Sequence, residues 1–142
     1  MKIRLKLPEK FHFETSLKIR VSDLNYGGHL GNDSVLSLAH EARVRFFSYL
    51  GVTERNFFHI GLIMADSAVI YKSQGFLNDN ILLQISVTEF RSHGFKLFYL
   101  LKKRDSNTDL AYVQTSMVCF DYVKNKILPI PKKFKDLVNE IT

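Results

Sequence analysis

The stretch from Arg20 to Gly51 limits the possible folds of this chain more than any other segment. It starts as the end of an alternating strand, which residues 25–28 (Asn-Tyr-Gly-Gly) interrupt, because glycine adopts backbone angles that other residues avoid. A long helix is predicted next, with Asn32 or Asp33 as its N-cap and Gly51 as the glycine just beyond its end. Its apolar stripe at helical spacing consists of Val35, Leu38, Ala39, Ala42, Phe46 and Tyr49. Such an apolar helix is predicted to be enclosed by other elements.

The rest of the chain is predicted to form mostly strands. Alternating or apolar runs indicate strands over 11–22, 62–73, 81–90, 95–103 and 110–123, a short basic edge strand over 1–7 and a terminal helix over 132–141. Short connections between the late strands favour antiparallel pairing. One helix and one antiparallel sheet bury each other only if the sheet curls around the helix. We therefore expect an α+β fold, an antiparallel β-sheet wrapped around one long central helix, as a single domain over 1–142.

Composition restricts the function only weakly. The formal net charge of +6 fits partners that carry phosphate, and it is equally common among ordinary soluble proteins. The aromatic residues fall on predicted core faces without a recognition motif, so we expect no nucleic-acid partner. Cys119 is the one cysteine, which excludes an intrachain disulfide and a zinc cluster. No run reaches the roughly 18 apolar residues of a membrane span, and no signal peptide is visible, so a cytoplasmic protein is expected.

The central stretch also carries a motif. The residues that form this motif are Arg20, Ser22, Asp23, Gly28, His29, Asn32, Glu41, Ala42, Arg43, Leu50 and Gly51. On these residues the chain resembles the hotdog-fold acyl-CoA thioesterases of the 4-hydroxybenzoyl-CoA thioesterase type. Two positions depart from that pattern: Asn25 replaces the usual catalytic aspartate, and Gly31 replaces the first asparagine of an Asn-Asn pair.

The resemblance implies a hotdog fold and a hydrolase that cleaves a thioester to a carboxylic acid and a free thiol. It implies no metal and no cofactor, since the coenzyme A moiety belongs to the substrate. The partner is an acyl-CoA or an acyl-carrier-protein thioester, and the site lies between subunits of a homodimer or homotetramer. The alternative is a non-catalytic hotdog protein that binds the acyl-CoA or acyl-carrier protein, because Asn25 stands where the acid is expected.

Substrate-binding candidates follow from the chemistry of a thioester. A backbone N–H near Asn32, at the helix start, is expected to polarise the carbonyl, although Asn32 is equally suited to be only a helix cap. His29 is a candidate to contact the substrate or to shape the loop, and its neighbour Tyr26 is a second candidate contact. Arg91 is a candidate for the phosphates of coenzyme A, where its charge would make binding sensitive to salt.

The catalytic base is the open question. Asn25 cannot act as a base at neutral pH, although its amide can orient water. Asp23 would share a strand face with Asn25, and otherwise it bonds the loop backbone. Glu41 lies on the helix, and otherwise it only pairs with Arg45. If Glu41 or Asp23 is the base, Asn25→Asp should lower activity; if neither is, Asn25→Asp should raise it. Asp66, in an apolar strand, is a lesser candidate that otherwise faces solvent.

An apolar outer face of the sheet suggests how copies associate. Phe98, Leu100, Val118 and Phe120 are predicted to lie on that face and to be covered by a second copy of the chain.

Overall fold

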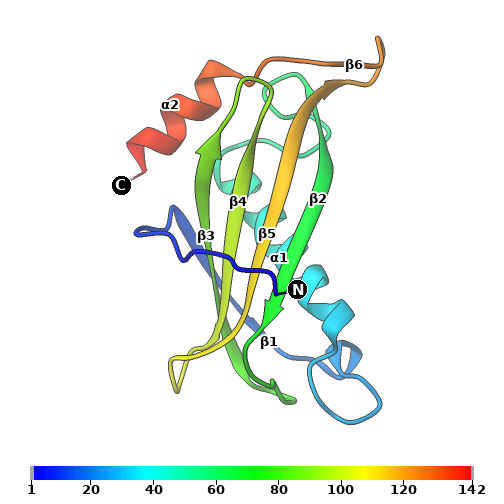
Figure 1. The fold of residues 1–142 in the computed structure, drawn as a ribbon, viewed down its shortest axis with the longest axis vertical. Helices are drawn as coiled ribbons and strands as arrows, with labels where there is room; N and C mark the ends of the chain where they lie inside the picture. Colours follow the sequence, from blue (N-terminus) through cyan, green and yellow to red (C-terminus); the bar gives the residue numbers. More distant parts are fainter. Residues whose placement is uncertain (1, 142) are drawn as a thin grey trace.

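The computed structural model describes residues 2–141 as one antiparallel sheet with a long helix packed against it (Figure 1). The elements are β1 (Phe13–Lys18), a 3-10 helix η1 (Val21–Asp23), α1 (Asn32–Tyr49), β2 (Gly61–Tyr71), β3 (Asn80–Phe90), β4 (Gly94–Lys103), β5 (Thr108–Asp121), β6 (Lys126–Ile127) and α2 (Lys132–Glu140). The sheet order is β1-β3-β4-β5-β2, and β6 pairs with β5 outside this path. The predicted α+β class and the antiparallel sheet around one long helix are confirmed.

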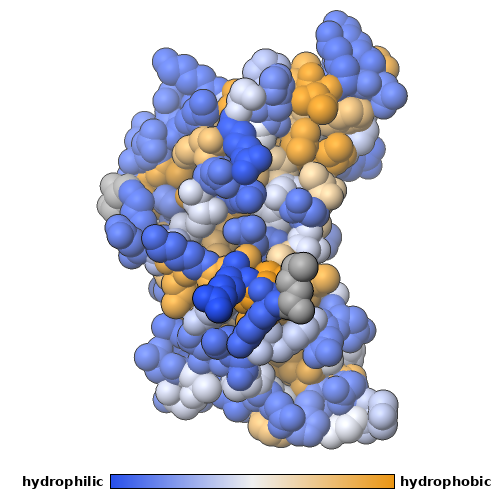
Figure 2. Space-filling model, in the orientation of Figure 1, coloured by the Kyte–Doolittle hydropathy of each residue, from blue (hydrophilic) through white to orange (hydrophobic). Residues whose placement is uncertain are grey.

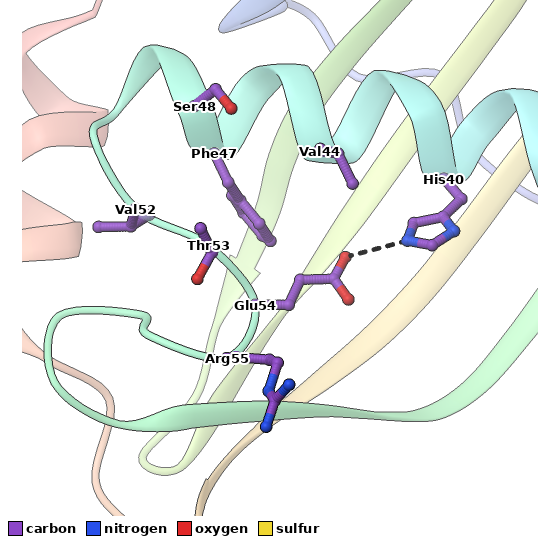
Figure 3. A pocket seen from close by; sticks show the side chains of 8 residues that line it. All are labelled: His40, Val44, Phe47, Ser48, Val52, Thr53, Glu54 and Arg55. Carbon is purple, nitrogen blue, oxygen red and sulfur yellow. Dashed lines mark ion pairs between the residues drawn. The ribbon is translucent and has the colours of Figure 1, made fainter.

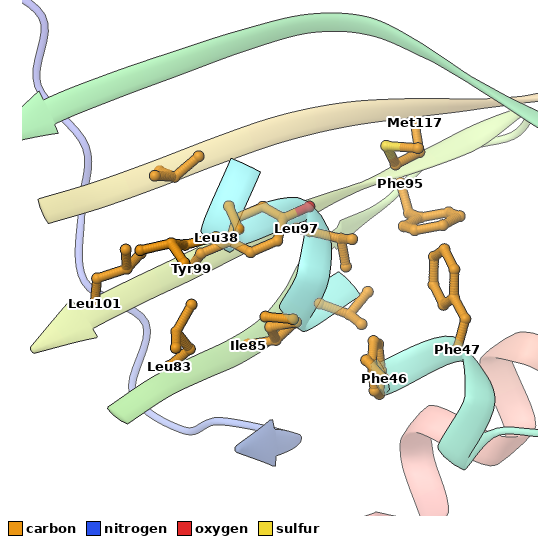
Figure 4. Close-up of a cluster of buried hydrophobic side chains, with 14 of the residues drawn as sticks. Leu38, Phe46, Phe47, Leu83, Ile85, Phe95, Leu97, Tyr99, Leu101 and Met117 are labelled. Carbon is orange, nitrogen blue, oxygen red and sulfur yellow. The ribbon is translucent and has the colours of Figure 1, made fainter. Parts of the chain in front are cut away.

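Helix α1 lies against one face of the sheet and forms the core with it. Figure 4 shows its large apolar side chains, Leu38, Phe46 and Phe47, facing the inward residues of β3 and β4. Tyr99 in β4 is fully buried and pairs in register with Ile85 of β3 and Val113 of β5. Each such side chain contributes about 1.5–3 kcal/mol when fully buried. Strand β4 is buried on both faces, as a central strand is expected to be.

The ends of α1 differ in how well the sequence predicts them. The C-terminal end is as expected: Gly51 has a φ of +80°, and Val52 N–H donates to the Phe47 carbonyl at 2.9 Å. At the N-terminal end, the predicted cap at Asn32 or Asp33 is wrong, because Gly31 is the cap and makes no side-chain bond. A Cβ at Gly31 would lie 2.7 Å from Oδ1 of Asp33, so glycine leaves room for that carboxylate.

Two predictions for the first part of the chain are wrong. The strand predicted over 11–22 spans only Phe13–Lys18, because the chain turns into the 3-10 helix Val21–Asp23 before the loop. Asp23 and Asn25 therefore do not share a strand face. The edge strand predicted over 1–7 does not form in its described part, residues 2–7; Met1 lies outside the described residues.

The segment over 2–10 instead runs across the outer face of the sheet, in front of β4 and β5 (Figure 1). Phe98 and Leu100 on that face are only 1% and 6% exposed, so the prediction that they form an open patch is wrong. Val118 and Phe120 are half-buried. Figure 2 shows this side of the molecule, with hydrophilic side chains lying across it and apolar groups visible between them.

The described helices also bear on the membrane. Neither helix within residues 2–141 combines the length and the apolar character needed to cross a bilayer.

Candidate active site

The loop before α1 is a tight turn closed by its own backbone. Asn25 N–H donates to the His29 carbonyl at 2.8 Å, and Gly28, at the tip, has a φ of +80°. The side-chain Oδ1 of Asn25 accepts bonds from the N–H groups of Gly27 (3.0 Å) and His29 (3.2 Å). The amide oxygen at the family's catalytic position is therefore occupied in holding the loop.

The loop leads into the start of α1, where two backbone N–H groups have no hydrogen-bond acceptor in the described part of the chain. Gly31 N–H donates to the Asp23 carbonyl, and Ser34 N–H donates to the Gly31 carbonyl. The N–H groups of Asn32 and Asp33 have no acceptor among residues 2–141, as is usual for the first residues of a helix. Together with the helix dipole, they favour an oxygen that carries negative charge.

A cavity of about 310 Å³, here called the N-terminal cavity, opens at this helix start. Its lining includes Asn25, His29, Asn32, Tyr71, Lys72 and Gln74. The hydroxyl of Tyr71, at the end of β2, donates to the Asn32 carbonyl at 3.3 Å. The structure thus brings three predicted residues, Asn25, His29 and Asn32, together in one cavity. It adds Tyr71 and Lys72, which no local sequence pattern connects with the loop.

His29 presents one ring nitrogen to this cavity at most. Nδ1 of His29 is enclosed and is the one buried side-chain nitrogen or oxygen without a hydrogen-bond partner in the described part of the chain. The ring packs against Phe76 with centroids 5.0 Å apart. Nε2 is therefore the ring nitrogen available to a ligand.

The two predicted carboxylates lie outside the N-terminal cavity. Asp23 is 4% exposed, and its carboxylate accepts the backbone N–H of Arg20 at 2.8 Å and contacts the Arg20 guanidinium at 3.2 Å. Glu41 points away from the core and pairs with Arg45 at 2.8 Å. Both geometries match the structural alternatives set out for these residues, and neither side chain lines the cavity.

The other predicted residues are also separate from it. Tyr26 is fully exposed at the tip of the loop. Arg91 lies in the β3–β4 turn, bonded to Glu89 at 3.1 Å, at the other end of the sheet from the loop (Figure 1). Asp66 is exposed and lines a different cavity together with Arg91.

A second cavity of about 240 Å³, the central cavity, lies between the same two elements, α1 and β2. It is lined by Leu36, Ser37, Ala39, His40 and Arg43 of α1, Met64 and Ser67 of β2, and Thr115 of β5. We call the two cavities together the α1–β2 groove. Figure 3 shows a third cavity further along α1, where the carboxylate of Glu54 points toward His40, with 3.8 Å between them.

A sheet curled around one long helix, with two cavities between α1 and β2, is the arrangement of a hotdog fold of the thioesterase kind. The family model of the thioesterase-like superfamily matches residues 19–138, so the chain belongs to that superfamily.

Individual relatives are distant in sequence and close in structure. A curated 1,4-dihydroxy-2-naphthoyl-CoA hydrolase from Synechocystis is 20% identical over 91% of this chain and 96% of its own length. The crystal structure of a 1,4-dihydroxy-2-naphthoyl-CoA thioesterase from Synechocystis superposes with a TM-score of 0.83 at 20% identity, over 91% of this chain and 96% of that one. A Staphylococcus aureus protein in complex with CoA gives a TM-score of 0.82 at 14% identity, over 97% and 87% of the two chains.

Proposed function

We propose that this protein is an acyl-CoA thioesterase, which hydrolyses an acyl-CoA to a carboxylic acid and free coenzyme A. The observation that carries the proposal is the N-terminal cavity, where the open start of α1 and the imidazole of His29 line one space. Membership of the thioesterase-like superfamily and a relative named as a CoA hydrolase support the same reaction.

The start of α1 would polarise the substrate. The N–H groups of Asn32 and Asp33 would donate to the thioester carbonyl oxygen. As water attacks the carbonyl carbon, negative charge moves onto that oxygen, so these donors stabilise the transition state more than the ground state. The effect needs no carboxylate in the cavity.

His29 is our candidate for the general base. Histidine is the side chain type that most readily exchanges protons near neutral pH, and Nε2 of His29 is the nitrogen available to the cavity. It would take a proton from the attacking water. When the tetrahedral intermediate collapses, the C–S bond breaks, and the imidazolium would return that proton to the departing thiolate. Glu41 and Asp23 would then keep structural roles.

Asn25 would position these groups. Its Oδ1 holds the N–H of His29 and so the imidazole that follows it in the loop. Its Nδ2 has no partner among residues 2–141; because Asn25 lines the cavity, this group would orient the attacking water. The amide would replace the family aspartate without acting as a base.

We propose a dimer of this chain as the working unit. Strand β2 ends the sheet, and its outer edge pairs with no strand among residues 2–141. Met64 and Tyr71 of β2 are 42% and 49% exposed. An exposed strand edge readily pairs with a second copy. Such pairing would cover the α1–β2 groove and exclude water from it. A tetramer, the acyl-carrier-protein alternative and the cytoplasmic location stay predictions.

One observation favours a second function. No Asp or Glu side chain within residues 2–141 lines the N-terminal cavity, and Asn25 is engaged with the loop. A protein with this cavity would bind an acyl-CoA without cleaving it if His29 did not activate water.

Release of free thiol from short, long and aromatic acyl-CoAs decides between the two functions. We expect turnover of at least one class, lost in His29→Gln. Saturable binding measured by calorimetry, without thiol release, would favour the binding protein. Neither binding nor turnover for any class would exclude both.

A further inference from the structure

A buried polar network lies beside the central cavity. Arg43 is only 5% exposed; its Nε donates to the carboxylate of Glu54, and its Nη1 donates to the hydroxyl of Tyr99 at 3.0 Å. That hydroxyl also bonds Oγ1 of Thr115 at 2.8 Å. Tyr99 and Thr115 are fully buried. The network therefore joins the loop after α1 to the centre of the sheet.

Fold stability does not explain this network. Replacing a buried ion pair by well-packed apolar residues is often neutral or stabilising, so such a pair is weak evidence for a stabilising role. Arg43 lies on the face of α1 that points to the core, and the other core positions of that face hold apolar residues. A polar network at this depth suggests a partner that recognises it.

Part of the network is free to bind a ligand. Nη2 of Arg43 has no acceptor among residues 2–141. In the described part of the chain, Nδ1 of His29 is the only fully enclosed side-chain nitrogen or oxygen without a partner. Nη2 of Arg43 also has no partner there, so it is not fully enclosed and borders open space. Arg43, Thr115 and Ser67 line the central cavity, and the hydroxyl of Ser67 has no partner among residues 2–141.

The central cavity lies in line with the reaction centre. Asn32 and Arg43 are eleven positions apart on α1, which corresponds to about 16.5 Å at 1.5 Å per residue. A long-chain acyl group with its thioester at the start of α1 would extend along the groove to Arg43. Between them Leu36 and Met64 line the cavity with apolar surface.

We infer that the central cavity selects acyl groups that carry a hydroxyl at the end remote from the thioester. This inference rests on the proposed thioesterase function. The oxygen of the substrate hydroxyl would accept a hydrogen bond from Nη2 of Arg43. The same hydroxyl would donate a hydrogen bond to the side-chain oxygen of Ser67 or Thr115. A carboxylate fits less well, because Glu54 already compensates the charge of Arg43 and a second anion would be buried without a counter-charge.

The test compares three substrates of equal length: dodecanoyl-CoA, its terminally hydroxylated form and its terminally carboxylated form. We expect the wild type to show a kcat/KM about tenfold or more higher for the hydroxylated form than for either other form. Arg43→Lys keeps a charge opposite Glu54 but loses the planar fork, and Thr115→Val and Ser67→Ala remove hydroxyls. Each should reduce the ratio of kcat/KM for the hydroxylated form to kcat/KM for the unsubstituted form.

Thr88→Val is the matched control for Thr115→Val, because Thr88 is exposed at the bulge of β3, outside the groove. It should keep the full preference. Thermal unfolding identifies any variant that fails to fold. If a variant at a buried position fails to fold, Ser67→Ala still tests the inference, because Ser67 is exposed and its replacement should not disturb the core.

Equal rates for the three substrates, a preference for the carboxylate, or an unchanged preference in the folded variants would overturn the inference. If no thioester is hydrolysed, the proposed function fails, and the subsite is tested separately with the three stable S-alkyl-CoA thioethers by calorimetry. Tighter binding of the hydroxylated thioether, lost in Arg43→Lys or Ser67→Ala, would support the subsite. Equal affinities or no binding would overturn it.

Discussion

The hydroxyl of Tyr99 accepts a hydrogen bond of 3.0 Å from Nη1 of Arg43, which lies 56 positions earlier in the chain. The bond ties the middle of the enclosed helix to the middle strand of the sheet. Burial raises the pKa of Tyr99, so the phenol stays protonated at neutral pH and can donate to Thr115. Glu54, in the loop after α1, supplies the charge that Arg43 needs at this depth.

Glu54→Gln should therefore destabilise the fold. It leaves the buried guanidinium of Arg43 without a counter-charge, and because Glu54 is partly exposed we expect a loss of about 2 kcal/mol in the free energy of unfolding. Glu41→Gln is the matched control, since the exposed Glu41–Arg45 pair contributes only about 0.3–0.5 kcal/mol. Urea unfolding of both variants measures the difference. Equal losses would show that Arg43 does not depend on Glu54.

Substitutions at Asn25 separate loop positioning from base catalysis. Asn25→Ala removes the acceptor of two backbone N–H groups, so kcat should fall about tenfold as the loop loosens. Asn25→Asp keeps an acceptor oxygen and adds a carboxylate in the cavity, so turnover should rise. If Asn25→Asp lowers turnover while Glu41→Gln or Asp23→Asn abolishes it, one of those carboxylates is the base instead.

His29→Gln should lower kcat about 100-fold or more while KM changes little, because a base acts in the transition state and contributes little to substrate binding. His59→Gln, in the exposed loop after α1, is the control and should keep the wild-type kcat. A kcat that His29→Gln leaves intact would assign the base to another group.

His12 should make stability depend on pH. Its Nδ1 accepts the N–H of Val87 at 3.0 Å, and burial, together with the charge of Lys10, lowers its pKa below the ordinary value of 6.5. As pH falls through 6.5, the unfolded chain binds a proton that the folded chain does not. The free energy of unfolding should therefore fall between pH 6.5 and the lowered folded pKa, and stay low below it.

His12→Asn keeps an acceptor near Val87 but does not titrate. Urea unfolding of the wild type and this variant at about pH 7.5 and pH 5.5 measures the contribution. The wild type should lose more stability than the variant on acidification. An identical loss in both would assign the pH dependence to other groups.

Met64→Lys should weaken the proposed dimer. Met64 lies on the free edge strand, where pairing would bury it, and burying an unpaired lysine is costly. Light scattering should return twice the 16.5 kDa chain mass for the wild type and the single mass for the variant at low micromolar concentration. Val21→Lys, at a position 73% exposed and outside β2, should stay dimeric. A wild type that is monomeric at every concentration contradicts the proposal.

Local patterns in the sequence determined most of the secondary structure. The 3.6-residue spacing of apolar residues predicted α1, and Gly51 predicted its end, because both depend on neighbours within a few positions. Alternating or apolar runs predicted β2 to β5 within one or two residues of their observed bounds. The sheet wrapped around a helix followed from the order of these elements and their shared need for burial.

Tertiary structure decided which side chains the site uses. Glu41 and Arg43 are two positions apart in one motif, yet the rotation of α1 against the sheet buries Arg43 and leaves Glu41 in solvent. Tyr71 reaches Asn32, and Tyr99 reaches Arg43, only because the sheet folds back onto the helix. Phe98 is buried on the outer face of the sheet, and the segment over 2–10 crosses that face, although local pattern had predicted a strand over 1–7. Contacts between residues far apart in the chain leave no periodic signal, so the packing of the whole domain was needed to establish them.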